Sequence, residues 1–207
     1  MRNQFERMIA GELYIAHDPI LGEKFTKCQT LLFEYNQTRF DQQERRAEIC
    51  KELFDSVGDN VTIIPPLRSD YGSNIKIGNN FFANYDCILL DVAPIEIGNN
   101  VMFGPRVGVY TAGHPLDAEV RDTGLEFGTP VKIGNSVWIG ANAVINPGVT
   151  IGNKVVIGSG SVVTKDIPDN VITVGNPCRV LREISVEDKK VWKELQENYE
   201  KEYGISL

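Results

Sequence analysis

Residues 131–163, VKIGNSVWIGANAVINPGVTIGNKVVIGSGSVV, decide the fold of this chain. An aliphatic residue returns every six positions, at Ile133, Ile139, Ile145, Ile151, Ile157 and Val163, and glycine follows four of them. A period this short does not fit a helical repeat, and it predicts a β-solenoid in which each hexad supplies one short strand and one turn. The same spacing occurs upstream from Ile77 to Leu89 and from Ile97 to Val109. We therefore predict a coil over residues 58–183.

The residues that face outward from this coil define three walls. Side chains alternate along a strand, so the residue just before each repeated aliphatic residue points outward. With three hexads to a turn, the first wall carries Lys76, Glu96, Lys132 and Thr150, the second Phe82, Met102, Trp138 and Val156, and the third Ile88, Gly108, Val144 and Val162. The second and third walls are largely apolar, which a solvated monomer rarely exposes. We expect copies of the chain to bury them, and a closed ring of three copies buries two walls of each. Alternatively, flanking helices cover one wall.

Helical patterns flank the coil on both sides. An apolar stripe with steps of three and four residues runs through residues 1–57, at Phe25, Cys28, Leu32 and Tyr35. A second helix is predicted in residues 184–207, where Ser185 is a suitable cap and one face carries Trp192, Leu195 and Tyr199. We expect this last helix to close or brace the end of the solenoid, because an open end exposes unpaired strand edges.

The hexad spacing has one long interruption, a step of 24 positions from Val109 to Ile133. If the coil continued through it, three inward positions would hold Pro115, Arg121 and Phe127. An interior lined by aliphatic side chains does not accept that set. Residues at about 111–130 are therefore predicted to leave the coil as an extruded loop. Long ordered loops on a rigid scaffold tend to carry function.

Composition limits the partners of the chain. Its 207 residues carry a net charge of −7 at pH 7, which argues against nucleic acid because phosphate binding needs a basic face. No apolar run approaches the roughly 20 residues of a membrane span. The N-terminus has no apolar signal core either, so we expect a cytoplasmic protein with no membrane partner. The four cysteines, Cys28, Cys50, Cys87 and Cys178, are far apart and predict free thiols without a disulfide or a zinc site.

The chain has only two histidines, His17 and His114. His17 lies in the N-terminal segment, whereas His114 lies at the root of the extruded loop, beside the apolar walls. An imidazole with a pKa near 6.5 is a suitable general base at neutral pH, so His114 is the candidate catalytic group. Alternatively, it is a structural or merely exposed histidine. Glu126, in the same loop, is a candidate to orient it.

Several motifs together resemble the maltose/galactoside O-acetyltransferases. They are residues 83–86 (ANYD), 110–115 (YTAGHP), 134–140 (GNSVWIG) and 145–152 (INPGVTIG), with further likeness in residues 8–14 and 163–180. The resemblance implies a left-handed parallel β-helix and a homotrimer with active sites between adjacent copies. It implies acetyl transfer from acetyl-CoA to a hydroxyl, commonly the 6-OH, of a sugar such as maltose, glucose or a galactoside. No metal is needed, because a thioester is already activated.

The resemblance also implies roles for individual residues. His114 removes the proton of the acceptor hydroxyl, and a backbone N–H near Ala141 stabilises the oxyanion. The acceptor sugar is expected to contact Asn84, Asp70, Asp91 and Phe82. Acetyl-CoA is expected to contact Gly104, Trp138, Ala141, Thr164, Lys165, Arg179 and Arg182. Structural alternatives stay open for these residues: a turn-stabilising asparagine, solvated carboxylates, core packing, a tryptophan in a subunit interface and a solvated basic stretch.

Three other functions compete with sugar acetylation. The first is acetyl transfer to another acceptor, such as a xenobiotic, an amino sugar or serine, and the N-terminal segment argues against serine. The second is a hydratase of the carbonic anhydrase type, which needs three histidine ligands where this chain has two histidines in all. The third is a non-catalytic scaffold, which has no use for a histidine at the root of the loop.

Overall fold

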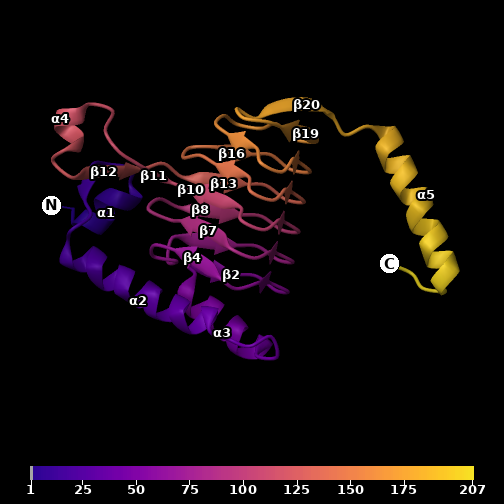
Figure 1. Ribbon diagram of the computed structural model, residues 1–207, viewed down its shortest axis with the longest axis horizontal. Helices are drawn as coiled ribbons and strands as arrows, with labels where there is room; N and C mark the ends of the chain where they lie inside the picture. The colour runs from indigo at the N-terminus through magenta and orange to yellow at the C-terminus, as the bar shows by residue number, and fades with distance from the viewer. Residues whose placement is uncertain (1) are drawn as a thin grey trace.

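In the computed structural model, which describes residues 2–207, the chain winds into a coil with three parallel sheets (Figure 1). The first wall is formed by β2 (Ser56–Val57), β5 (Ile75–Ile77), β8 (Ile95–Ile97), β13 (Val131–Ile133) and β16 (Thr150–Ile151). The second wall is formed by β3 (Thr62–Ile63), β6 (Phe82–Ala83), β9 (Met102–Phe103), β14 (Trp138–Ile139), β17 (Val156–Ile157) and β19 (Val171–Val174), with β20 (Arg179–Glu183) antiparallel to β19. The third wall is formed by β4 (Leu67–Ser69), β7 (Cys87–Leu90), β10 (Gly108–Tyr110), β15 (Val144–Ile145) and β18 (Val162–Val163).

The register of these sheets confirms the hexad interpretation. On the first wall Lys132 pairs with Glu96 and with Thr150, and the Lys132 ammonium lies 3.2 Å from the Glu96 carboxylate. On the second wall Trp138 pairs with Met102 and with Val156. Each predicted row of outward residues is therefore a vertical column in the structure. The β-solenoid fold predicted from the sequence is correct.

The interior of the coil is aliphatic and closely packed. The repeated residues Ile139, Ile145 and Val163 have no exposed surface, and neither do the residues two positions before the first two of them. Phe81 and Phe103 meet edge to face with ring centroids 5.1 Å apart. Short β-branched side chains suit this interior, because it is narrow and each hexad sends two residues into it, such as Val137 and Ile139.

Helices close the lower end of the coil. They are α2 (Pro19–Asn36) and α3 (Gln43–Leu53), whereas α1 (Gln4–Ile9) lies to the side and packs on α2 (Figure 1). Helix α2 buries Leu21, Cys28, Leu32 and Tyr35, whereas Phe25 of the predicted stripe stays 45% exposed. Strand β4 is the last strand of the third wall, and Asn36 satisfies part of its free edge. The Asn36 side chain donates to the carbonyl of Leu67 and accepts from the N–H of the same residue.

Between β10 and β13 the chain leaves the coil. The excursion contains β11 (Ala112–Gly113), α4 (Ala118–Arg121) and β12 (Leu125–Gly128). Strand β12 pairs antiparallel with β11 and with β1 (Tyr14–Ile15) from the N-terminal segment. The N-terminal segment and the loop that carries His114 are thus joined in one small sheet, order β1-β12-β11.

The last helix, α5 (Val186–Tyr203), does not close the coil. None of its residues is buried, and Figure 1 shows it apart from the sheets, running alongside them. The expectation that it braces the end of the solenoid is therefore wrong for the single chain. No helix among residues 2–207 combines the length and apolar character that crossing a membrane requires.

Candidate active site

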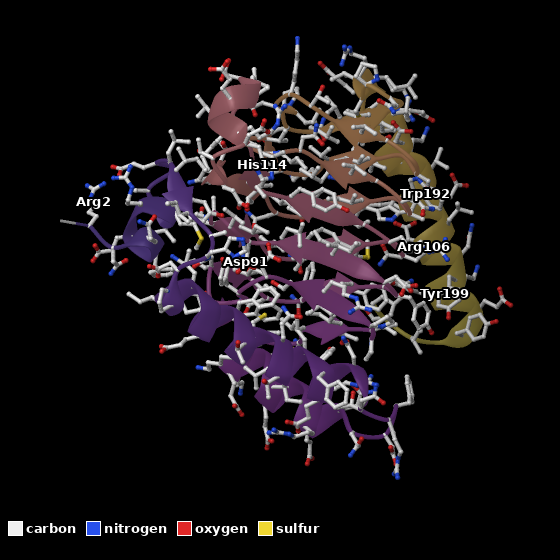
Figure 2. The ribbon with its side chains drawn as sticks, turned by 60° about the vertical axis from the view of Figure 1, so that its left-hand side comes forward. Arg2, Asp91, Arg106, His114, Trp192 and Tyr199 are labelled. Carbon is white, nitrogen blue, oxygen red and sulfur yellow. The ribbon has the colours of Figure 1, made fainter. Side chains whose placement is uncertain are left out.

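The predicted site residues lie on two different corners of the coil. We call the turns that follow the third-wall strands the histidine corner, because they hold Asp70, Asp91 and, beyond β11, His114. We call the turns between second-wall and third-wall strands the asparagine corner, because they hold Asn84, Gly104 and Ala141. Figure 2 shows His114 and Asp91 on one side of the molecule and Arg106, a member of the asparagine corner, on the other. Within one chain, the third wall separates the two groups.

Asp91 is a structural carboxylate. It has no exposed surface, and its oxygens accept from the Ser69 hydroxyl at 2.8 Å and from the backbone N–H groups of Asp70, Tyr71 and Asn74 at 3.2, 2.9 and 3.2 Å. A carboxylate with four donors from its own turn and no solvent access is closed off from a sugar. The expectation that Asp91 contacts the acceptor is therefore wrong. It fixes the turn that presents Asp70.

Asp70 is the carboxyl that this turn makes available. It is half-buried, and its side chain accepts no hydrogen bond from residues 2–207. Burial, with the nearby charges of Asp91 and Glu126, raises the pKa of Asp70 to about 6. A half-buried carboxyl without its own hydrogen bonds, held in a concave surface, is typical of a ligand-binding site.

A pocket of about 400 Å3 opens in front of Asp70. It lies between the N-terminal helices and the histidine corner, and it is lined by Tyr14, Ala16, His17, Asp18, Leu21, Gly22, Phe25, Asp70, Tyr71, Val92 and Glu126. The lining contains three carboxyl side chains and no lysine or arginine. Sequence reasoning missed Tyr14 and Tyr71, although Tyr14 stands in one of the matching motifs.

Glu126 is held by the N-terminal segment. Its carboxylate accepts from the Tyr14 hydroxyl at 2.7 Å, across the β1–β12 pair. Burial raises the pKa of the Tyr14 phenol, and the Glu126 carboxylate raises it further, so the phenol keeps its proton and donates. No hydrogen bond joins Glu126 to His114 in the described chain. The structure therefore shows Glu126 anchoring the loop through Tyr14, and not orienting the imidazole.

The position of His114 is fixed through its backbone neighbours. Thr111 is buried, its hydroxyl donates to the carbonyl of Leu90, and it accepts from the N–H of Ala93. The next two residues, Ala112 and Gly113, pair with β12. The imidazole itself is exposed and forms no hydrogen bond with the residues that the structure describes.

The asparagine corner presents a free backbone donor. The N–H of Ala141 is half-buried and donates to no acceptor in residues 2–207. Gly104 lies in the coil below, where an added Cβ would stand 2.6 Å from the Ala141 nitrogen. Glycine at this position keeps the amide open to a ligand. Asn84 is half-buried on the same corner, and its side-chain oxygen accepts from the N–H of Tyr85.

The remaining predicted residues are dispersed. Trp138 is 52% exposed on the second wall, above half-buried Phe82. Thr164 and Lys165 follow β18 at the upper end of the histidine corner. Arg179 lies on β20, and Arg182 forms a two-pronged ion pair with Asp188 at 2.6 and 2.9 Å. That pair engages two nitrogens of the Arg182 guanidinium, and the side chain stays 48% exposed. Among residues 2–207, no three His, Cys, Asp or Glu side chains are grouped to hold a metal ion.

Comparisons with known proteins agree with these features. A family model described as "Maltose acetyltransferase hexapeptide capping motif" matches residues 7–58. A second, "Bacterial transferase hexapeptide (six repeats)", matches residues 130–165. The chain is 47% identical to the galactoside O-acetyltransferase of Escherichia coli K12 over 89% of this chain and 91% of that protein. It is 46% identical to nodulation protein L of Rhizobium meliloti over 86% of this chain and 98% of that protein.

Solved structures give the same result. The maltose O-acetyltransferase from Clostridium difficile 630 superposes with a TM-score of 0.88 at 52% identity, covering 89% of this chain and 98% of the other. A galactoside acetyltransferase in complex with coenzyme A gives a TM-score of 0.88 at 46% identity, covering 91% of this chain and 94% of the other. Identities this high over nearly the full length show the family as well as the fold. The chain belongs to the maltose/galactoside O-acetyltransferase family of hexapeptide-repeat acetyltransferases.

Proposed function

We propose that this acetyltransferase moves the acetyl group of acetyl-CoA to the 6-OH of a sugar, in sites formed between adjacent copies of a homotrimer. In each site, His114 comes from one copy, and Asn84 and the Ala141 amide come from its neighbour. The observation that carries this proposal is the division of the site residues between two corners of one coil. A second copy placed with its asparagine corner against the histidine corner reunites them.

The apolar walls support the same assembly. Met102 and Trp138 are 50% and 52% exposed on the second wall of the single chain. Large exposed side chains of this kind mark protein interfaces, and a three-fold ring buries two walls of each copy. The same contact would cover His114, which is exposed in one chain. Excluding water strengthens the hydrogen bonds made to the reacting groups.

The residues of the two corners supply complementary steps. The His114 imidazole takes the proton of the sugar hydroxyl while the hydroxyl oxygen attacks the thioester carbonyl. The Ala141 N–H donates to the oxyanion, an interaction typically worth about 3 kcal/mol. The carbon–sulfur bond then breaks, and the imidazolium returns its proton to the leaving thiolate. Holding both substrates in one cleft supplies the orientation part of the rate enhancement.

The pocket beside Asp70 is the proposed acceptor site. Ionised Asp70 and Glu126 accept hydrogen bonds from sugar hydroxyls, and the Tyr71 and Phe25 rings offer apolar faces to a sugar ring. With three carboxyl groups and no lysine or arginine in the lining, the pocket disfavours phosphorylated or acidic sugars. Neutral acceptors such as maltose, glucose or a galactoside fit this charge. The names of the related enzymes point to the same class of acceptor.

The test is His114→Ala, with Glu119→Ala, an exposed residue of the same loop outside the pocket lining, as its control. Loss of a general base lowers transfer by at least about 100-fold. Because the His114 ring makes no hydrogen bond, its removal is expected to change the free energy of unfolding by less than about 0.5 kcal/mol. Thiol release from acetyl-CoA, measured with maltose, glucose, a β-galactoside and an amino sugar, gives the rates. Near-normal turnover of His114→Ala would remove the proposed role.

A further inference from the structure

Helix α5 carries an apolar stripe that nothing in its own chain covers. Trp192, Leu195, Tyr199 and Tyr203 recur at steps of three and four residues and are 70%, 52%, 48% and 61% exposed. The rings of Tyr199 and Tyr203 pack on each other with centroids 4.7 Å apart. At about 200 Å2 for each aromatic side chain, the three rings alone expose roughly 350 Å2. That area is already comparable with the largest apolar patch of a typical monomer.

The helix is nevertheless held firmly to the coil at its start. Ser185 caps it in a reciprocal capping box with Asp188. Asp188 also forms the two-pronged ion pair with Arg182 of β20. The N–H of Ile184 donates to the carbonyl of Asn170 at 2.9 Å, which ties the connection to the coil itself. These contacts fix the direction in which α5 leaves, so its separation from the coil is specified by the structure.

The length of α5 matches the height of the coil. Its 18 residues span about 27 Å at 1.5 Å per residue. The parallel strands of the second wall, from β3 to β19, span about 24 Å at about 4.8 Å between neighbours. Figures 1 and 2 both show α5 running along the side of the coil, from the β19–β20 end toward the opposite end. A helix in this place can lie along the full height of another coil.

We propose that α5 packs its apolar stripe against the coil of an adjacent copy. We call this contact the clasp. This inference rests on the trimer of the proposed function, and it adds a second contact to that interface. Helix α5 follows directly after β20, the edge strand of the second-wall sheet, on which Val180 and Leu181 are also exposed. A helix that leaves from the edge of the wall expected to meet a neighbour is most simply covered by that same neighbour.

The charge of α5 argues against a membrane as the occupant. The helix contains six acidic and four basic residues in the segment VEDKKVWKELQENYEKEY. Helices that bind anionic lipid surfaces carry an excess of lysine and arginine on their polar face. A net negative helix is repelled by such a surface, whereas its apolar stripe still suits a protein wall.

The experiment uses Trp192 as a reporter in the full-length chain. The protein has two tryptophans, so Trp138→Phe leaves Trp192 alone, and sedimentation of this background is measured first. In the assembled protein, Trp192 emission is expected to be blue-shifted and at least threefold less quenched by acrylamide than in protein diluted to monomers. Equal quenching of the assembled and the dissociated protein would overturn the proposal, as would protection that persists in the monomer.

A matched pair of variants tests the stripe itself. Leu195→Glu with Tyr199→Glu is expected to raise the dissociation constant of the assembly at least tenfold by sedimentation velocity. Glu194→Lys with Glu197→Lys, on the opposite face, is expected to leave it within about twofold. The clasp would be contradicted if the stripe variant assembled with the same dissociation constant as the wild type. It would also be contradicted if the wild type, but not the stripe variant, co-sedimented with phosphatidylserine vesicles. Catalysis at concentrations where the stripe variant is assembled should stay normal, which separates failure of the clasp from failure of the proposed function.

Discussion

Replacing Asp70 by Asn should stabilise this protein at neutral pH while damaging its activity. The Asp70 carboxyl is half-buried, accepts no hydrogen bond from residues 2–207, and lies near Asp91 and Glu126. Burial and these neighbouring charges raise its pKa from an ordinary value of 3.8 to about 6. Asparagine keeps the shape and removes the charge, so it relieves this unfavourable environment without breaking an existing contact.

The size and the sign of the effect follow from the pKa. Because the folded state holds the carboxyl at a higher pKa than the unfolded chain does, ionisation of Asp70 opposes folding. The cost is absent below about pH 3.8, grows between the two pKa values and is complete above about pH 6. A shift of about two units corresponds to roughly 3 kcal/mol, and screening by water at this half-buried site reduces it to about 1–2 kcal/mol. For a chain of this size that raises Tm by about 3–6 °C.

The assay is thermal unfolding of wild type and Asp70→Asn from pH 4 to pH 8, with exposed Asp122→Asn as control. The gain from Asp70→Asn should be near zero at pH 4 and largest above pH 6.5, and the control should show no such dependence. In parallel, kcat/KM for a neutral sugar should fall at least tenfold at pH 8, since the acceptor loses a charged hydrogen-bond partner. A gain that is equal at pH 4 and pH 8, or a destabilised variant at pH 8, would refute the reasoning.

Two further substitutions test the supports of the site. Asp91→Ala leaves two buried and two half-buried donors without an acceptor, and should lower the free energy of unfolding by about 3–5 kcal/mol. Asp91→Asn keeps one acceptor and should cost about 1–3 kcal/mol. Equal chemical denaturation midpoints for the two variants would contradict this role. Tyr14→Phe removes the donor to Glu126 and should cost about 1–2 kcal/mol. It should also loosen the β1–β12 contact, which faster hydrogen exchange of the paired residues Leu125 and Glu126 would report. Unchanged exchange would show that the hydrogen bond does not hold the loop.

The sequence predicted the coil well because the fold depends on a strictly local rule. Ile133, Ile139 and Ile145 are spaced by the length of one strand and one turn, so their period sets both the register and the direction of every side chain on the walls. The extruded stretch near His114 followed from the same rule, because Arg121 and Phe127 do not suit the interior. The handedness of the coil came only from the family resemblance.

The predictions that depended on contacts far apart in the sequence were weaker. Asp91 was expected at the acceptor, but its turn folds back and surrounds it with donors from residues 69–74. Tyr14 was missed because its partner Glu126 lies 112 residues away. Helix α5 was predicted, but its amphipathic pattern shows only that one face needs a partner. The pattern does not show which surface provides it.

Subunit complementation tests the shared site most directly. Asn84→Ala should be about tenfold less active, the effect of losing roughly 1–2 kcal/mol of substrate hydrogen bonding, and His114→Ala should be at least about 100-fold less active. If each site combines His114 of one copy with Asn84 of its neighbour, random mixing of equal amounts of the two variants restores about a quarter of the sites. Activity after co-refolding should then rise to roughly a quarter of the wild-type value, well above the average of the two variants. A co-refolded mixture that stays at that average would show that each chain builds its site alone.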